Sequence, residues 1–221
     1  LEIPSTGVKV NYRPFLVKEQ KVLMIASEQG GEKALLRAVG RIIKDCTMGM
    51  IENPEDLPTF DMEYIFLKIR GKSVGDKVEL NLLCPDDEKT RVMTEIDLSK
   101  VQATKSNHDG IIKISDTIGM TMKYPTVKDL VNYGGEKSSV KMTFDIIESC
   151  TVNIFDEENV YEDFTKKELR DFFDQLSTDN FTKIEEFFDS MPKLSHTVKV
   201  KNPNTGVESD IVLEGLQSFL G

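Results

Sequence analysis

The feature that most restricts the fold of this chain is a concentration of acidic and aromatic residues between positions 151 and 190. This stretch contains 12 Asp and Glu against four Lys and Arg, so its balance of −8 accounts for most of the formal net charge of −10. It also contains seven of the twelve phenylalanines. Acidic and apolar residues mixed at this density are typical of amphipathic elements that bury one face. We therefore predict an amphipathic unit here.

The spacing of the apolar residues predicts two helices in this unit. Thr165 and Glu168 match a capping box, in which each side chain accepts a hydrogen bond from the backbone amide of the other residue. Ser177 begins the second helix and Pro192 follows its end. The apolar stripes recur at helical spacing and comprise Leu169, Phe172, Phe173 and Leu176, then Phe181, Ile184, Phe187, Phe188 and Met191. We therefore predict an acidic, Phe-rich helical hairpin over 151–192.

The remainder of the chain predicts an α+β protein with three further regions. Residues 1–74 combine a short hairpin from Ile3 to Tyr12 with helices at about 15–29, from Ala34 to Cys46, and from Met62 to near Gly71. Residues 75–150 form a β-rich central region, with strands at 77–84, 91–98, 110–114 and 118–124 and helices at 126–132 and 136–149. Residues 193–221 form a β-hairpin and a short helix that we expect to pack on the central region.

Several classes of protein are disfavoured by composition and motifs. The longest apolar run, Val22 to Ala26, is far shorter than the roughly 20 residues that span a bilayer, and LEIPSTGVKV lacks the charged and apolar regions of a signal peptide. No HExxH, GxSxG, P-loop or GxGxxG motif occurs, and two histidines leave an enzyme the weakest interpretation. The acidic balance argues against a general nucleic-acid binder. Three cysteines suit a reducing cytoplasm better than a disulfide framework.

Two hairpin turns resemble zinc knuckles that have lost their metal ligands. A knuckle has the form C-P-x-C-G and directs two thiolates at one ion. The first turn has Cys84 and Asp87 at the ligand positions, and the second has Asn202 and Thr205. Three of these four residues are not thiolates, and the neutral amide and hydroxyl bind zinc poorly. We predict that the chain folds without metal or cofactor and that side-chain hydrogen bonds hold the turns.

Four segments of the sequence resemble a known family. They are IPSTGVKVNYRPFLVKEQKVL (3–23), LPTFDMEYIFLKIRGKSVGDKVEL (57–80), MKYPTVKDL (122–130) and LEGLQSFL (213–220). The chain is similar to the T4-type bacteriophage baseplate hub assembly proteins, and the string from Ser5 to Glu19 is the most specific part of the likeness. The family carries a C-terminal C-x-x-C-G turn, where this chain has Asn202 and Thr205.

The resemblance implies a late, non-enzymatic phage protein that helps to build the central hub of the tail baseplate. Its partners would be other phage baseplate hub or tail proteins, with no nucleic acid and no membrane. It would be found in the host cell cytoplasm during assembly, or in the virion tail baseplate. We predict a chaperone-like assembly function. The alternatives are a permanent structural subunit of the virion and, more weakly, a zinc-ribbon-like nucleic-acid-binding protein.

Two groups of residues are candidates for partner contacts, because the centres of interfaces favour aromatic side chains and Arg. One is the set of paired phenylalanines on the helical hairpin, although core packing is the favoured interpretation of such a stripe. The other is formed by Arg13 and Phe15, although pairing of Arg13 with Glu19 or with an acidic helix face is the favoured interpretation. The candidate aromatic residues of the hairpin are Phe172, Phe173, Phe187 and Phe188.

Overall fold

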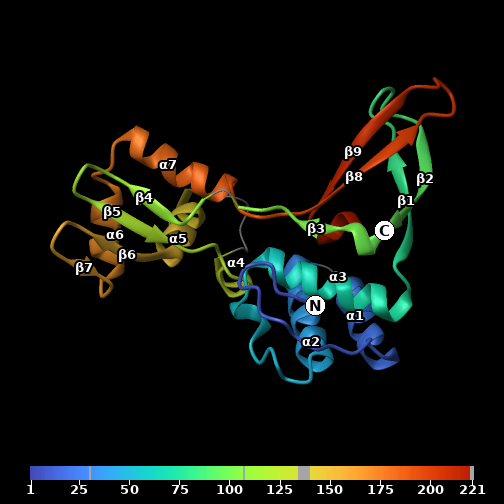
Figure 1. Ribbon diagram of the computed structural model, residues 1–221, viewed down its shortest axis with the longest axis horizontal. Coiled ribbons are helices and arrows are strands. Elements are labelled where there is room, and N and C mark those ends of the chain that lie inside the picture. Colours follow the sequence, from blue (N-terminus) through green and yellow to red (C-terminus); the bar gives the residue numbers. More distant parts are fainter. Residues whose placement is uncertain (30, 107, 134–139, 220–221) are drawn as a thin grey trace. The chain divides into compact units, whose positions relative to one another are not determined.

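The computed structural model describes residues 1–29, 31–106, 108–133 and 140–219 and divides the chain into two compact units (Figure 1). Unit 1 comprises Leu1–Thr104 and Pro192–Gly221, and unit 2 comprises Lys105–Met191. Both units combine helices with small antiparallel sheets, so the predicted α+β class is confirmed. The division into four regions, 1–74, 75–150, 151–192 and 193–221, remains a prediction from the sequence.

Three helices form the α-helical part of unit 1. They are α1 (Val17–Gln29), α2 (Glu32–Cys46) and α3 (Thr59–Val74), with a 3-10 turn, η1 (Pro54–Asp56), before α3. Val39, Ile42, Ile43 and Cys46 of α2 are fully buried, as their helical spacing predicts. Half of the residues of α3 are buried too, because apolar residues occupy several of its faces.

The end of α3 corrects the predicted boundary. The helix continues through Gly71 to Val74 and is capped by Gly75, whose φ of 100° is accessible to glycine at little cost. A Cβ atom at Gly71 would collide with the carboxylate of Asp76, so this glycine permits a close approach instead of ending the helix. The two glycines are four residues apart, and in the sequence either one could mark the C-terminal end of the helix.

The N-terminal hairpin is a tight turn anchored on α3. One β-bridge joins Glu2 and Lys9, instead of the longer ladder that alternation over Ile3 to Tyr12 suggests. The backbone amide of Ser5 donates to Oδ1 of Asp61 at 3.0 Å, and the Ser5 hydroxyl donates to the same carboxylate. Asp61 is fully buried near the start of α3, so this turn satisfies a carboxylate that would otherwise be costly to bury.

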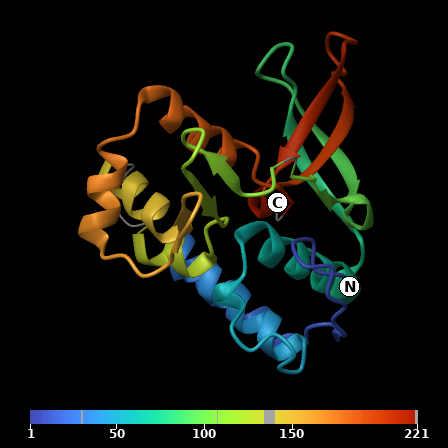
Figure 2. The ribbon, with the colours of Figure 1, turned by 60° about the vertical axis from the view of Figure 1, so that its left-hand side comes forward.

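The β part of unit 1 contains two hairpins that lie side by side in both ribbon views (Figures 1 and 2). The first pairs β1 (Lys77–Leu83) with β2 (Arg91–Asp97). The second belongs to a sheet of order β3-β8-β9, formed by Gln102–Ala103, Leu194–Lys201 and Glu208–Glu214. Strands β2 and β8 contact each other. The short helices η2 (Leu98–Lys100) and η3 (Leu216–Phe219) follow β2 and β9.

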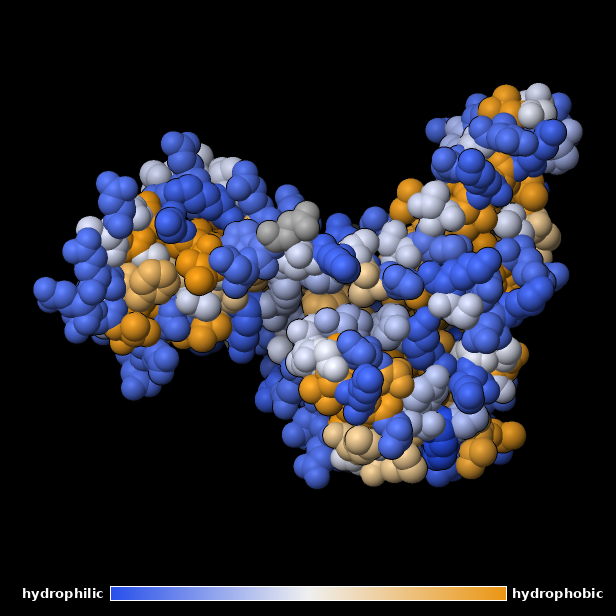
Figure 3. Space-filling view, in the orientation of Figure 1, coloured by the Kyte–Doolittle hydropathy of each residue, from blue (hydrophilic) through white to orange (hydrophobic). Residues whose placement is uncertain are grey.

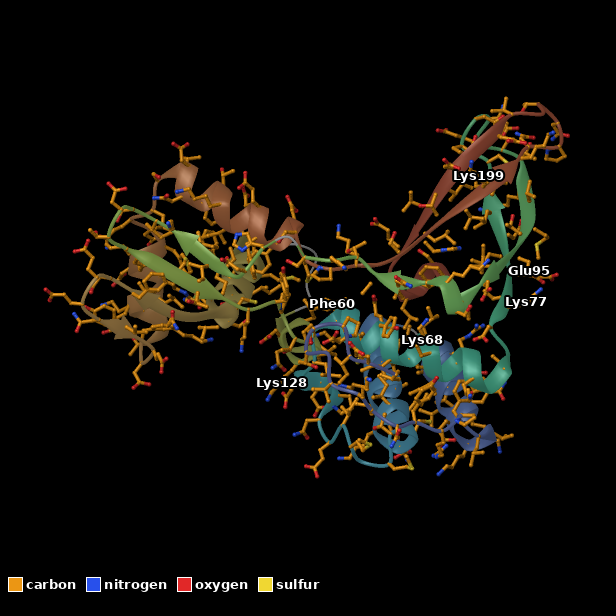
Figure 4. The ribbon with its side chains drawn as sticks, viewed as in Figure 1. Phe60, Lys68, Lys77, Glu95, Lys128 and Lys199 are labelled. Atoms are coloured by element: carbon orange, nitrogen blue, oxygen red, sulfur yellow. The ribbon has the colours of Figure 1, made fainter. Side chains whose placement is uncertain are left out.

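Lys68 joins the helical and β parts of unit 1. Its ammonium group donates to the carbonyl oxygens of Ser99 at 3.1 Å and Val101 at 3.2 Å. Burial lowers the pKa of Lys68, and the two carbonyl groups compensate part of that cost. On the first hairpin, Lys77 and Glu95 form an exposed cross-strand ion pair at 2.7 Å (Figure 4). An exposed pair of this kind contributes little to stability.

Unit 2 is built on a four-stranded antiparallel sheet of order β4-β5-β6-β7. Its strands are Ile111–Lys113, Gly119–Met122, Thr151–Phe155 and Val160–Tyr161. Its helices are α4 (Val127–Tyr133), α5 (Val140–Cys150), α6 (Lys166–Phe173) and α7 (Thr178–Asp189). One hydrophobic core joins the sheet to α5, α6 and α7 through Ile112, Met120, Ile147, Leu169 and Phe187, among others.

Two features of the acidic segment differ from the predicted helical hairpin. Its first part forms β6 and β7, and Asp156 closes the turn between them by accepting from the amides of Glu158 and Asn159. In addition, α6 contacts α5, whereas α7 contacts β4 and places the ring of Phe181 beside that of Phe144 in α5. The sequence pattern shows an apolar face but not what covers it. The predicted helix at 136–149 begins outside the described residues.

Candidate partner-binding site

Hydrogen bonds at their first turns position the two acidic helices as the sequence predicts. Thr165 Oγ1 accepts from the amide of Glu168 at 3.2 Å, and Glu168 Oε2 accepts from the amide of Thr165 at 2.8 Å. The hydrogen bonds that the Glu168 carboxylate accepts from the amide and the hydroxyl of Thr165 hold the pKa of Glu168 below its ordinary value. Ser177 caps α7 by accepting from the amide of Asn180. Both predicted helix starts are confirmed.

An ion-pair cluster fixes α6 against α5. The guanidinium group of Arg170 donates to Asp145 at 3.0 Å and to both carboxylate oxygens of Glu148. The side chain of Glu148 is almost fully buried, so loss of Arg170 would leave a buried charge without its partner. The acidic character of this unit is therefore partly compensated at the α5–α6 contact.

The paired phenylalanines divide into one buried and one partly buried residue in each pair. Phe173 and Phe187 are only 5% and 1% exposed, whereas Phe172 and Phe188 lie at the edge of the core. The ring of Phe187 stacks on Tyr124 with centroids 4.8 Å apart. Phe187 and Phe173 are core residues, so only the partly buried member of each pair has an aromatic surface available to a partner.

An apolar groove lies between α5 and α7, and we call it the α5–α7 groove. Its volume is about 500 Å³. It is lined by Thr143, Ile146, Ile147, Phe181, Ile184, Glu185, Phe188 and Asp189. In the space-filling view, hydrophobic surface on unit 2 is interrupted by hydrophilic side chains (Figure 3). The groove combines partly exposed aromatic rings with carboxylates, a pattern suited to protein contacts.

The charged residues of the α5–α7 groove are acidic. Glu185 and Asp189 are exposed and one turn apart on α7, and neither has an ion-pair partner within the part of the chain that the structure describes. The nearest base on α7, Lys183, donates instead to the carbonyl of Lys113 at 2.8 Å and to Asn180 at 2.9 Å. An apolar floor with two unneutralised carboxylates fits a partner with apolar and basic groups.

The N-terminal candidates are already engaged inside unit 1. Arg13 Nη2 donates to Glu19 Oε1 at 2.8 Å, which is the alternative pairing suggested by the sequence. Burial would raise the pKa of Glu19, but hydrogen bonds from Arg13 and from the amide of Leu16 outweigh it and lower the pKa to about 2. Phe15 is partly buried, and its amide donates to Ser73 Oγ at 2.8 Å. These residues anchor the segment before α1.

The two knuckle-like turns meet through hydrogen bonds that use a residue not singled out from the sequence. Asn202 Nδ2 donates to both oxygens of Asp86, at 3.0 and 3.1 Å, and Thr205 Oγ1 donates to the same carboxylate. These bonds, first from Asn202 and then from Thr205, lower the pKa of Asp86. Asn202 is 1% exposed, so the contact is well shielded on that side.

The other two knuckle positions have local roles. Asp87 accepts hydrogen bonds from the backbone and hydroxyl of Thr90 in its own turn. Cys84 is buried, and burial raises the pKa of its thiol. Among the described residues, no group of three or more His, Cys, Asp or Glu side chains is arranged to hold a metal ion. The sequence signal for Asp86 is its place in the Cys84 turn, which it shares with Asp87.

The fold and these surfaces define an α+β protein with an apolar, acidic groove available for protein contacts. The family model described as T4 bacteriophage base plate protein matches residues 1–221, and the chain belongs to this family. No curated protein and no solved structure matches the chain. The likeness to phage baseplate proteins inferred from the sequence is confirmed, and membership implies contacts with other baseplate proteins. None of the described helices is long and apolar enough to cross a membrane.

Proposed function

We propose that this protein assists assembly of the baseplate central hub through protein–protein contacts, as a chaperone-like factor without catalytic activity. In this proposal the α5–α7 groove binds a segment of an unassembled hub subunit that has an apolar face and basic side chains. The observation that carries the proposal is the pair of unneutralised carboxylates, Glu185 and Asp189, beside the exposed edges of Phe181 and Phe188.

The α5–α7 groove is complementary in polarity and charge to a partner with an apolar face and basic side chains. Burying an aromatic edge in a partner is favourable at about 25 cal/mol per Å² of apolar surface, and opposite charges at the rim speed association and favour the correct partner. Unassembled hub subunits must keep their mutual interfaces from premature contact. A groove that covers an apolar, basic surface would do so until the native neighbour displaces it.

The experiment compares three forms of the full chain in infected cells. They are the wild type, a groove variant with Glu185→Lys and Asp189→Lys, and a control variant with Glu157→Lys and Glu162→Lys. Both double variants change the charge of unit 2 by the same amount, and Glu157 and Glu162 are exposed outside the groove. Mass spectrometry of co-purified proteins should show a baseplate protein lost from the groove variant and retained by the control. Equal recovery from both folded variants would refute the groove as the binding site.

A second measurement separates a transient factor from a permanent subunit, which is the main alternative. Purified phage particles are analysed by mass spectrometry with the known tail proteins as internal standards. A chaperone-like factor should be absent or far below one copy per baseplate. A fixed stoichiometric amount in mature particles would instead establish a structural subunit.

A further inference from the structure

A second apolar groove, of opposite charge, lies in unit 1 between α1 and α2, and we call it the α1–α2 groove. Its volume is about 300 Å³. It is lined by Val22, Ile25, Ala26, Ala34, Arg37, Ala38 and Arg41. Ala26 and Ala38 are buried at its base, whereas Ile25 is 52% exposed. The small residues keep the groove open, and the larger ones provide apolar walls.

The two arginines of the α1–α2 groove have no acidic partner in the described structure. Arg37 and Arg41 are one turn apart on α2 and both are exposed. Neither takes part in a hydrogen bond or ion pair within the described ranges, and Glu19, the buried acid of α1, is committed to Arg13. Their guanidinium groups are therefore available to a ligand.

The charge of this helical pair is opposite to that of the whole chain. Between residues 17 and 46 the sequence has six bases and four acids, a balance of +2, in a chain of net charge −10. The bases are Lys18, Lys21, Lys33, Arg37, Arg41 and Lys44, and the acids are Glu19, Glu28, Glu32 and Asp45. A local excess of positive charge on an acidic protein favours an acidic partner at this surface.

We propose that the α1–α2 groove binds an acidic amphipathic helix of another protein. Its apolar face would lie against Val22 and Ile25, and two carboxylates one turn apart would pair with Arg37 and Arg41. Helix-in-groove recognition uses apolar anchors at this spacing, and the planar guanidinium group binds carboxylates in bidentate fashion. The site is separate from the α5–α7 groove and does not depend on the proposed function of that groove.

Other occupants fit the groove less well. Nucleic acid would require many more bases, because its affinity comes from neutralising successive phosphates, and most of this lining is apolar. A second copy of this chain would bring another net charge of −10, which opposes self-association at low ionic strength. The acidic helix of a different protein combines the required apolar face and charge.

The test measures binding of two fluorescent synthetic helical peptides to the full chain by fluorescence anisotropy. One peptide has Leu on one face and Glu one turn apart at its edge, and the other has Lys in place of every Glu. We expect the Glu peptide to bind at least tenfold more tightly than the Lys peptide. Arg37→Glu combined with Arg41→Glu should weaken Glu-peptide binding at least tenfold, and Ile25→Asp should weaken it separately.

Matched controls keep the test specific. Lys199→Glu combined with Lys201→Glu changes the charge of unit 1 equally, at two exposed positions on β8, and should leave binding unchanged. Figure 4 shows Lys199 on this hairpin, away from α1 and α2. Glu185→Lys with Asp189→Lys should also leave it unchanged, so failure of the α5–α7 proposal would not affect this result. Circular dichroism verifies that each variant is folded.

Three results would overturn the inference. The first is no measurable binding of the Glu peptide at 100 µM protein, since a groove whose dissociation constant is weaker than about 1 mM would not be useful. The others are equal binding of the Glu peptide by the Arg37 and Arg41 double variant, and equal binding of the Lys peptide by the wild type. Sedimentation of the wild type gives one more outcome. If the chain dimerises and the double variant is monomeric, the occupant is a second copy, and the proposal of a different partner is wrong.

Discussion

Replacing Phe187 by alanine is expected to destabilise the protein much more than replacing its neighbour Phe188. Phe187 is 1% exposed and has ring contacts with Tyr124 at 4.8 Å, His108 at 5.3 Å and Phe188 at 5.3 Å. Truncation of a buried Phe to Ala typically costs about 3–5 kcal/mol, and each lost aromatic pair accounts for about 0.5–1.5 kcal/mol of such a figure. We expect a loss near the upper end.

The expected loss at Phe188 follows from its partial burial at the rim of the α5–α7 groove. If about half of a Phe side chain, on the order of 100 Å², is removed from water on folding, its truncation costs about 2.5 kcal/mol at 25 cal/mol per Å². Binding should respond in the opposite order. Phe188→Ala removes an exposed aromatic edge from the groove, so recovery of the partner should fall more for folded Phe188→Ala than for folded Phe187→Ala.

Urea unfolding followed by far-UV circular dichroism and tyrosine fluorescence measures both losses in the full chain, which has no tryptophan. In a unit of this size each 1 kcal/mol lowers the Tm by roughly 4–8 °C, so thermal unfolding gives an independent value. Phe187→Leu provides a milder variant if the alanine variant does not fold. Equal losses for Phe187 and Phe188 would refute the division of each Phe pair into a core and a rim residue.

Three further predictions concern stability, pH and thiol chemistry. The pKa of Glu19 is lowered from 4.5 to about 2 in the folded protein, so its contribution to stability is present above pH 4.5 and lost as the pH falls towards 2. Glu19→Gln should therefore reduce the dependence of the urea midpoint on pH over that range. The same pH dependence in the variant and the wild type would contradict the pairing with Arg13. Asn202→Ala should lower the Tm while a chelator leaves the wild-type Tm unchanged, whereas a chelator-induced drop would show that a metal holds the turns. Burial raises the pKa of Cys150 to about 12, so its thiol should react with an aromatic disulfide at pH 8 only after unfolding; rapid labelling of the native protein, mapped by mass spectrometry, would disprove its burial.

The features that the sequence predicts correctly are those decided by neighbouring residues. The Thr165–Glu168 capping box closes within one helical turn, and the pairing of Arg13 with Glu19 spans only six residues. Local patterns also locate β1 and β2, because alternation and a polar turn suffice to define a hairpin.

The features that the sequence does not predict depend on distant residues. Phe187 and Phe188 are about 100° apart on a helix, so periodicity admits both to the apolar face. Tyr124, more than sixty positions away, is what covers Phe187. Asp86 is similarly indistinguishable from Asp87 until the turn containing Asn202 lies beside it. The strands β6 and β7 also escape the pattern, since their apolar residues continue directly from α5 and only the neighbouring β5 gives them a pairing edge.

Unit 2 is inserted between two paired strands of unit 1, and this affects the order of events during synthesis. Gln102 of β3 pairs with Ser195 of β8, and the amide of Thr104 donates to the carbonyl of Lys193 at 2.9 Å. A ribosome adding about 5–20 residues per second needs several seconds to make the intervening segment. Until then the buried carboxamide of Asn202 is missing from its contact with Asp86, and β2 lacks its neighbour β8. Residues 1–104 therefore have the apolar face of β2 uncovered until β8, which is translated only after unit 2, has been made.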